Sequence, residues 1–305
     1  MRILFLINLY NDDCLEVMKN LPSNYYDVLL VDPPYEYLNH KLDKKFDEQA
    51  VFDQWNRILK QDGFIILFGR GASFYRWNVM LDNLGWKFKE EVIWDKMRTT
   101  SPILPLMRVH ETISILAKNG KGKINKTCVP YTDSRLTPEV VLGDIKRLES
   151  GLNQNNKAYG ELLHYLKTHD TTIAQKSATK DVITFNPSKN FRTNSRIAAI
   201  AKSMLKGKRE TDIMSMTSPA RSHRYHPTQK PTKLLERLLK LVVASDNAKI
   251  IDTFMGSGST GVACVDLNNK EHTHYSFTGI ELDNEYFEIA KKRIEETKKN
   301  DNRYL

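Results

Sequence analysis

The feature that most constrains the fold of this chain is a series of short apolar runs that alternate with segments of helical periodicity. Runs that are apolar at nearly every position are typical of strands buried on both faces of a parallel sheet. Alternation of such strands with helices predicts a doubly wound α/β fold with a mostly parallel, seven-stranded Rossmann-like sheet. The predicted strands are Ile3–Tyr10, Val28–Val31, Phe64–Phe68, Glu91–Trp94, Thr112–Ala117, Ile250–Phe254 and Phe277–Leu282.

The predicted helices repeat apolar residues at intervals of three and four, which places those residues on one face. Gln49–Lys60 shows this pattern most fully. Leu234–Val243 and Asn284–Ile294 behave likewise, and Thr260–Leu267 begins after a glycine-rich stretch. These helices are expected to cover the two faces of the predicted sheet.

A central segment, residues 119–222, differs from the rest because it is rich in Lys, Asn, Ser and Thr and has few strand-like runs. Between Lys118 and Tyr225 lie 20 of the 46 Lys and Arg residues but only 9 of the 37 Asp and Glu residues. This pattern predicts a basic insertion in a core formed by residues 1–118 and 223–305. A polyanionic partner would explain the charge, and so would a solvated, lysine-rich surface.

The cysteines and the amino-terminal run argue against several classes of protein. Cys14, Cys128 and Cys264 form no CxxC pair and no metal-ligand spacing, which favours reduced thiols in a cytoplasmic protein without a bound metal. The apolar run from Ile3 to Ile7 is short and is soon followed by Asp12-Asp13, unlike a signal peptide. No apolar stretch is long enough to span a membrane.

The first motif is Asp32-Pro33-Pro34-Tyr35, which directly follows the predicted strand Val28–Val31. Proline cannot continue a strand ladder and fixes its own backbone angle. Because the carboxyl ends of parallel strands face the ligand crevice of an open α/β sheet, Asp32 and Tyr35 are predicted to project into that crevice. The alternative is a plain turn, since Asp-Pro and Pro-Pro are common turn dipeptides.

This first motif suits a reaction at the exocyclic amine of a planar base. Such an amine is a poor nucleophile because its lone pair is delocalised into the ring. Asp32 can accept one amine hydrogen and the carbonyl of Pro33 the other, which directs the lone pair towards an electrophile. Tyr35 offers a flat face on which a base extruded from a duplex can stack.

The second motif is Asp252-Thr253-Phe254-Met255-Gly256-Ser257-Gly258-Ser259-Thr260-Gly261, after the apolar run Lys249-Ile250-Ile251. Glycines allow a tight turn and close approach of a ligand, and amides at a helix start favour a negative group. Glu281, in the next predicted strand, can accept hydrogen bonds from a ribose diol. The motif therefore indicates an adenosine-type cofactor. Its glycines also fit G-x-G-x-x-G, so NAD is an alternative, as is a glycine-rich loop without a ligand.

Together the two motifs resemble those of the DNA amino-methyltransferases, specifically the permuted group called β-class. In that group the Asp-Pro-Pro-Tyr motif comes first, a target-recognition region follows, and the Phe-x-Gly-x-Gly motif comes last. Here Tyr35 precedes Phe254 with the basic segment between them, so the order is the same. The resemblance covers roughly residues 8–118 and 223–298, and it implies a methyltransferase sheet with an inserted target-recognition lobe over 119–222.

Shorter segments carry the same resemblance. Asn11–Glu16 is similar to the family's amino-terminal segment, and Trp94-Asp95-Lys96 and His110-Glu111 resemble its later core motifs. His226–Pro231 resembles the segment that closes over the methionine end of the cofactor. Lys230 would then pair with the cofactor's carboxylate.

The resemblance also implies which residues form the site. Asp13 would contact the adenine edge of the cofactor, and Asp12 stands where the family usually has glycine. The predicted catalytic residues are Asp32, Pro33, Pro34 and Tyr35. The predicted contacts of S-adenosylmethionine are Asp13, Cys14, Asp32, His226, Lys230, Asp252, Phe254, Gly256, Ser257, Gly258, Ser259, Thr260, Glu281 and Leu282. The predicted DNA contacts are Lys189, Arg192, Arg196, Lys206, Lys208 and Arg209.

The implied activity is transfer of a methyl group from S-adenosylmethionine to N6 of a flipped adenine in double-stranded DNA. Relatives that act on N4 of cytosine usually carry serine in place of Asp32, which favours adenine. RNA and protein-glutamine methyltransferases are alternatives, although they mostly carry the glycine motif first. An NAD-dependent oxidoreductase and an inactive DNA-binding module represent other classes. A homodimer and a cognate restriction endonuclease are partners that the resemblance allows.

Overall fold

The structure, a computed structural model, describes residues 6–35, 45–98, 105–133, 140–146, 203–204, 206–219, 225–226 and 229–300. The chain forms two compact units, one of Met1–Asn125 with Asp212–Leu305 and the other of Lys126–Thr211. The second unit lies within the predicted insertion, but the core begins again before residue 223. The reason is β8 (Ile213–Ser215), which pairs with the core sheet. Within the described ranges, no helix is both long and apolar enough to cross a bilayer.

The first unit is built on one sheet whose eight described strands follow the order β1-β10-β9-β2-β3-β5-β4-β8. Pairing is parallel throughout, except that β5 runs antiparallel to both of its neighbours, β3 and β4. The prediction of a mostly parallel sheet is therefore confirmed, with β8 added. The strands besides β8 are β1 (Ile7–Tyr10), β2 (Tyr26–Val31), β3 (Leu59–Gly69), β4 (Trp86–Asp95), β5 (His110–Lys118), β9 (Lys249–Asp252) and β10 (Ser276–Ile280).

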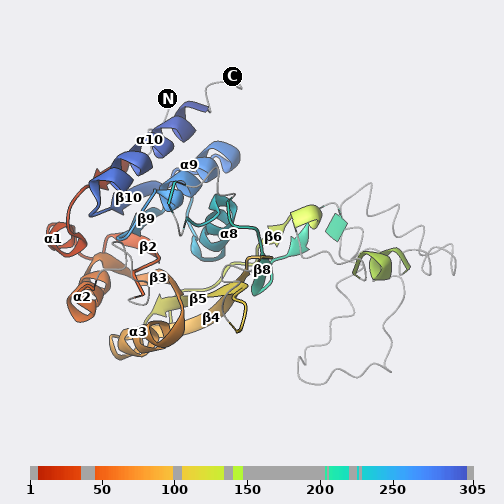
Figure 1. The fold of residues 1–305 in the computed structure, drawn as a ribbon, viewed down its shortest axis with the longest axis horizontal. Coiled ribbons are helices and arrows are strands. Elements are labelled where there is room, and N and C mark those ends of the chain that lie inside the picture. Colours follow the sequence, from red (N-terminus) through yellow and green to blue (C-terminus); the bar gives the residue numbers. More distant parts are fainter. Residues whose placement is uncertain are drawn as a thin grey trace. The chain divides into compact units, whose positions relative to one another are not determined.

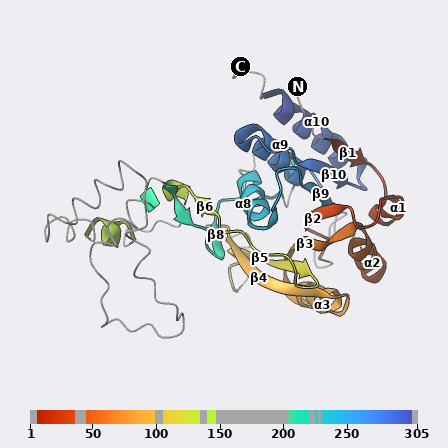
Figure 2. The same ribbon diagram turned by 180° about the vertical axis from the view of Figure 1, so that it is seen from behind.

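Helices cover both faces of this sheet (Figures 1 and 2). Along β2, Val28 and Leu30 pack in one core layer, whereas Leu29 and Val31 pack in the other. Because successive side chains of a strand point to opposite faces, this alternation explains why the run is apolar at every position. The first layer contains α8 (Thr232–Val242), α9 (Ser259–Glu271) and α10 (Asn284–Asn300), and the second contains α1 (Cys14–Lys19), α2 (Glu48–Ile58) and α3 (Gly71–Asn83).

The strands β2 and β9 meet where the direction of winding reverses. From β2 the chain crosses through α2 to β3 on one side, and from β9 it crosses through α9 to β10 on the other. The two strands are joined through the pairs Val28–Ile250 and Leu29–Ile251, so opposite halves of the chain place their carboxyl strand ends side by side. In open α/β sheets, ligands bind outside the carboxyl ends of the strands at such a switch point.

The described part of the second unit contains a short antiparallel ribbon of β6 (Cys128–Val129) and β7 (Lys208–Arg209). Gly207 precedes β7 with a φ of +87°, and a Cβ there would lie 2.1 Å from the carbonyl oxygen of Val129. Only glycine fits that position without displacing the backbone. Lys208 Nζ lies 3.0 Å from Asp144 Oδ2, and this ion pair helps to hold β7 in place.

Several predicted boundaries are wrong by a few residues. The strands predicted as Ile250–Phe254 and Phe277–Leu282 end earlier, at Asp252 and Ile280, because the acidic side chains there bind backbone amides of the following loops. The helix predicted as Gln49–Lys60 ends at Ile58, since Leu59 already begins β3.

The sequence pattern does not predict α1 or α3, and the reason differs between the two helices. α1 contains only 6 residues, too few for a helical period to repeat. α3 has no side-chain cap at its amino end, and it exposes Tyr75 and Val79 on its outer face, which blurs its apolar stripe.

Candidate active site

The carboxyl ends of three neighbouring strands each carry an acidic side chain at the switch point. Asp32 directly follows β2, Asp252 ends β9, and Glu281 directly follows β10. Burial, together with the nearby charges of Asp32 and Glu281, raises the pKa of Asp252 to about 7. The two motifs predicted from opposite halves of the chain therefore lie within electrostatic reach of each other.

The Asp-Pro-Pro-Tyr motif is held by contacts to α3. The hydroxyl of Tyr35 donates a hydrogen bond to Asp32 Oδ1. The hydroxyl of Ser73 donates to the carbonyl oxygen of Tyr35 at 2.9 Å, and the ring of Tyr35 lies 6.0 Å from that of Trp77. These contacts, with the two prolines that end the strand, set the direction of both functional side chains.

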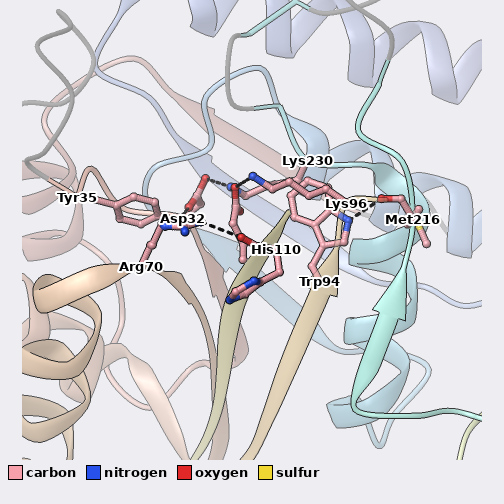
Figure 3. Close-up of polar contacts among 9 residues, drawn as sticks. Asp32, Tyr35, Arg70, Trp94, Lys96, His110, Met216 and Lys230 are labelled. Carbon is pink, nitrogen blue, oxygen red and sulfur yellow. Dashed lines mark hydrogen bonds and ion pairs between the residues drawn. The ribbon is translucent and has the colours of Figure 1, made fainter. Parts of the chain in front are cut away.

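Asp32 belongs to a cluster of four charged side chains, of which the two lysines are buried, and the sequence does not predict this cluster (Figure 3). Lys230 Nζ lies 2.6 Å from Asp32 Oδ2 and 2.8 Å from Glu111 Oε2. Lys96 Nζ lies 2.5 Å from Glu111 Oε1. The side chain of Asp32 is 22% exposed whereas that of Lys230 is 8% exposed, so Asp32 is the member of this ion pair that a ligand can reach.

Aromatic rings enclose the cluster from the side of the sheet. Lys230 Nζ lies 5.0 Å from the centre of the Phe68 ring and 5.8 Å from that of Trp94, and Lys96 Nζ lies 5.2 Å from Trp94. The indole Nε1 of Trp94 donates to the carbonyl oxygen of Met216 at 2.8 Å, which fixes the ring (Figure 3). Apolar rings keep water away from the charges and so strengthen the attraction between them.

Burial and neighbouring charges set the protonation of the cluster. Burial raises the pKa of Asp32 above its usual range, while the Lys230 ammonium and the Tyr35 hydroxyl act to lower it. Burial alone would lower the pKa of Lys230, but the carboxylates of Asp32 and Glu111 raise it above its usual range. Burial would likewise raise the pKa of Glu111, but Lys230 and Lys96 lower it to about 2. The ionised form of Asp32 therefore depends on Lys230.

Side chains at the strand ends organise the glycine-rich loop between β9 and α9. Asp252 Oδ1 accepts a hydrogen bond from the amide of Phe254 at 3.1 Å, and Oδ2 accepts one from the hydroxyl of Thr260 at 2.6 Å. Glu281 Oε2 accepts one from the amide of Gly256 at 2.9 Å. Two amides of the loop thus already donate to protein carboxylates rather than facing a phosphate.

The glycines of this loop differ in what they make possible. A Cβ on Gly258, whose φ is +76°, would lie 2.8 Å from the Cβ of Ala290 in α10, so this glycine is needed for packing. For Gly256, whose φ is +52°, the nearest atoms to a Cβ belong to the His226 ring at 3.8 Å. Gly256 is therefore the position at which the loop leaves room for a ligand to approach the backbone.

The predicted contacts in the amino-terminal segment have clear structural roles. Asp13 is the N-cap of α1, and its Oδ1 accepts from the amide of Leu15 at 2.8 Å. Asp12 Oδ1 accepts from the amide of Asp13 at 2.8 Å, so an aspartate fits where the resemblance leads one to expect glycine. Cys14 is buried, and burial raises the pKa of its thiol to about 12, which suits packing rather than reactivity.

Other predicted cofactor contacts lie around the same loop. The ring of Phe254 lies 5.2 Å from that of Phe46, and the ring of His226 lies 4.3 Å from that of Tyr286. Leu282, beyond the end of β10, is 54% exposed. Lys230, for which a cofactor carboxylate is the predicted partner, instead has protein carboxylates as its partners.

Two residues that sequence reasoning misses hold this loop region together. Asn11 Nδ2 donates to the carbonyl oxygen of Glu281 at 2.9 Å, which joins the end of β1 to the end of β10. Arg293 of α10 donates to the carbonyl oxygen of Ser257, and to its hydroxyl at 3.0 Å, and it lies 3.5 Å from the hydroxyl of Ser259. Asn11 lies in the amino-terminal segment that carries the resemblance but is not among the predicted contacts. No motif signals Arg293, because its partners lie far away in sequence.

Only part of the predicted DNA contact set can be placed. Lys189, Arg192 and Arg196 lie outside the described residues. Lys206 and Arg209 are exposed in the second unit. Lys208 is half-buried and bound to Asp144, so it is less available to a phosphate than the sequence suggests.

The described residues contain no group of three or more His, Cys, Asp or Glu side chains placed to hold a metal ion. Ion pairs instead join Asp32, Glu111, Lys96 and Lys230, whose four charges balance.

The fold and its acidic strand ends define a Rossmann-like α/β protein with a ligand site at its switch point. Residues 26–292 match the profile of the DNA methylase family N6_N4_Mtase, and the chain belongs to this family. A curated relative, the Type II methyltransferase M2.DpnII of Streptococcus pneumoniae, is 35% identical over 309 residues, covering 94% of this chain and 89% of the relative.

Solved structures share the fold at lower identity. The crystal structure of an M1.HpyAVI–SAM complex has a TM-score of 0.52 and 19% identity, over 94% of this chain and 100% of that one. The cytosine-N4-specific PvuII DNA methyltransferase has a TM-score of 0.55 and 15% identity, over 98% of this chain and 92% of that one. At such identities these likenesses establish the fold alone.

Proposed function

We propose that this DNA methylase transfers a methyl group from S-adenosylmethionine to the N6 amine of an adenine flipped out of duplex DNA. The observation that carries the proposal is the position of Asp32. Its carboxylate is partly exposed at the switch point, beside a tyrosine ring and within electrostatic reach of Asp252, which directly precedes the glycine-rich loop. That arrangement unites an acceptor for an amine, a face for a base and a loop for a nucleoside.

The charge of the strand ends favours S-adenosylmethionine over NAD. When bound, S-adenosylmethionine supplies an electrophilic methyl group on a positively charged sulfur, and Asp32, Asp252 and Glu281 suit a cationic ligand. The pyrophosphate of NAD would meet these carboxylates at close range. It would also find the amides of Phe254 and Gly256 already donating to Asp252 and Glu281.

We assign the cofactor to the loop around Gly256 and to the ends of β1 and β10. Glu281 would accept hydrogen bonds from the ribose diol, since each of its oxygens has a lone pair beyond the one used by a backbone amide. Gly256 would allow the cofactor to approach the backbone, and Asp13 would face its adenine edge. Phe254 and His226 would line the same side.

The chemistry assigned to Asp32 is to stabilise positive charge on the target amine. As the nitrogen forms its bond to carbon, it acquires positive charge and then loses a proton. A carboxylate that already accepts one N6 hydrogen stabilises that charge as it develops, with no reorganisation of water. The carbonyl of Pro33 would accept the second hydrogen, and Tyr35 would stack on the base.

Adenine is favoured over cytosine by the aspartate at position 32, following the resemblance described above. The family profile includes both N6 and N4 enzymes. We further assign target recognition to the basic insertion, whose charge would supply contacts to phosphates.

Mass spectrometry of nucleosides from duplex DNA treated with the protein and S-adenosylmethionine tests the proposal. We expect N6-methyldeoxyadenosine, and N4-methyldeoxycytidine alone would overturn the choice of base. Asp32→Ala should abolish transfer while leaving the Kd for S-adenosylmethionine within about threefold of wild type, since it removes charge stabilisation at the amine. Asp82→Ala, at a position 58% exposed on the surface, is the control and should remain active. Absence of any methylated nucleoside would refute the activity.

A further inference from the structure

The buried ion pair beside the proposed catalytic carboxylate has no assigned role. We infer that Lys230 is a positioning residue that keeps Asp32 ionised and directs its Oδ1 towards the target amine, and that Glu111 sets how strongly Lys230 does so. This inference rests on the proposed function, because it concerns the state of Asp32 that the reaction needs.

Geometry supports an action of Lys230 on Asp32. Lys230 Nζ approaches Oδ2 at 2.6 Å, and the hydroxyl of Tyr35 binds Oδ1, so each oxygen of Asp32 has one donor. With Oδ2 held by Lys230, the carboxylate cannot rotate freely about its last bond. The amine of a base that enters can then bind Oδ1 through the lone pair that the tyrosine hydroxyl does not use.

The position of Lys230 in the fold indicates that its charge is stabilised by the two carboxylates. It lies directly before Pro231, the N-cap of α8, where the helix dipole disfavours a cation. It is also buried to 7% exposure, against the rings of Phe68 and Trp94. A buried ammonium at a helix start is stable only with anionic partners, which Asp32 and Glu111 supply.

Because Glu111 also binds Lys230, the ammonium group of Lys230 interacts with two carboxylates rather than with Asp32 alone. Glu111 binds Lys230 and Lys96 through different oxygens, at 2.8 Å and 2.5 Å. The four charges sum to zero, so the cluster holds an ionised Asp32 without leaving a surplus cation to repel a cationic cofactor. Removing Lys230 should therefore leave Asp32 protonated at neutral pH, and neutralising Glu111 should do the opposite.

The first test is the pH profile of single-turnover methyl transfer. Wild-type protein should reach its plateau below neutral pH. Lys230→Met should lose at least about tenfold in rate at pH 7 and recover about tenfold per pH unit as Asp32 ionises. Glu111→Gln should move the acidic limb of the profile to lower pH. A loss of rate in Lys230→Met that is the same at every pH would overturn the inference.

The second test separates Asp32 from the cofactor as the partner of Lys230. Calorimetry should give Lys230→Met a Kd for S-adenosylmethionine within about threefold of wild type. A rise of more than about tenfold together with an unchanged pH profile would assign Lys230 to the cofactor carboxylate instead. Lys118→Met is the matched control, because Lys118 is also 7% exposed but its Nζ donates to the carbonyl oxygens of Asn56 and Leu59. It should lower stability and leave the pH profile unchanged.

A third measurement does not need turnover. The infrared carbonyl band of protonated Asp32, identified by its absence in Asp32→Asn, can be titrated in the protein alone. It should appear at higher pH in Lys230→Met and at lower pH in Glu111→Gln than in wild type. If these shifts occur in protein that methylates nothing, the proposed function fails and the inference about Lys230 stands. If Lys230→Met does not fold, the Glu111→Gln shift decides alone, and no shift there overturns the inference.

Discussion

Single residues of the site have more than one partner, and Tyr35 shows the consequence. Its hydroxyl binds Asp32 Oδ1, the same atom that the proposed mechanism offers to the target amine. Its ring lies at a tilt to Trp77 and is the surface proposed to stack on the base. The hydroxyl and the ring therefore act in different ways on the entry of a base, since the hydroxyl uses one lone pair of the acceptor and the ring attracts the base.

Substitution of Tyr35 can separate these two effects. Tyr35→Phe keeps the ring and removes one hydrogen bond, whose net worth is about 0.5–1.5 kcal/mol, so the single-turnover rate should stay within about tenfold of wild type. Tyr35→Ala also loses stacking, worth about 1–3 kcal/mol per base, and should be much slower. Tyr75→Ala, at a position 71% exposed, is the control and should keep full activity. A Tyr35→Ala rate equal to that of Tyr35→Phe would show that stacking is not the role of the ring.

At the scale of secondary-structure elements, the conformation of the cofactor loop depends on how β9 is connected to α9. Asp252 connects the last residue of the strand to the first turn of the helix through the Thr260 hydroxyl, at 2.6 Å. It does so while buried, which raises its pKa to about 7. The connection is therefore sensitive to pH in a range where ordinary aspartates are fully ionised.

The free energy of unfolding of the protein should depend on pH because of Asp252. A group whose pKa is raised on folding contributes stability that is present at low pH and lost as pH rises through its folded pKa, here about 7. Asp252→Asn cannot ionise and retains a carbonyl for the Phe254 amide. It should therefore gain stability relative to wild type between pH 5 and pH 8, on the order of 1–3 kcal/mol at about 1.4 kcal/mol per pKa unit.

Urea unfolding of both proteins across that pH range measures this difference. Asp53→Asn, on the exposed face of α2, retains Asp252 and serves as the control, because its stability should follow the pH dependence of wild type. A constant difference between wild type and Asp252→Asn from pH 5 to pH 8 would contradict the raised pKa.

An element can be predicted from the sequence when its own residues determine it, but not when it depends on pairing with distant segments. Val28–Val31 is predicted correctly because a strand between two parallel neighbours must be apolar on both faces. The direction of β5 and the existence of β8 are not, because strand pairing at that edge depends on contacts between distant segments, such as Ile66 with Ile115 and Ile93 with Ile213. The six-residue α1 is too short for its periodicity to be seen.

At the scale of the whole molecule, local sequence predicts the two motifs, whereas the ion cluster depends on contacts between distant segments. The positions of Asp32 and Asp252 follow from strand ends, which local sequence marks with proline and glycine. The pairing of Lys230 with Glu111 joins residues 119 positions apart, and neither segment contains a sign of it. The resemblance includes both segments and suggests a cofactor carboxylate as a partner for Lys230, and the fold adds the carboxylates of Asp32 and Glu111.

The division into two units gives the last prediction. Val129 pairs with Lys208 in the antiparallel ribbon, so the chain enters and leaves the second unit at adjacent positions. Residues 130–207 can then be replaced by Asn-Gly, a two-residue turn that suits such a ribbon. The first unit holds the whole eight-stranded sheet and the candidate site, so the shortened chain should fold. Because the deletion leaves the cofactor site unaltered, the Kd for S-adenosylmethionine should stay within about threefold of wild type.

DNA binding should respond in the opposite way. Phosphate contacts make affinity fall steeply with salt, with a slope of about −0.9 for each contact, and the removed segment contains much of the basic excess of the insertion. The shortened chain should bind duplex DNA more weakly and with a shallower salt dependence, measured by fluorescence anisotropy between low and physiological salt. Equal affinity and equal slope in the two proteins would place the DNA contacts on the core instead, and would leave the basic charge of the insertion as a solvated surface.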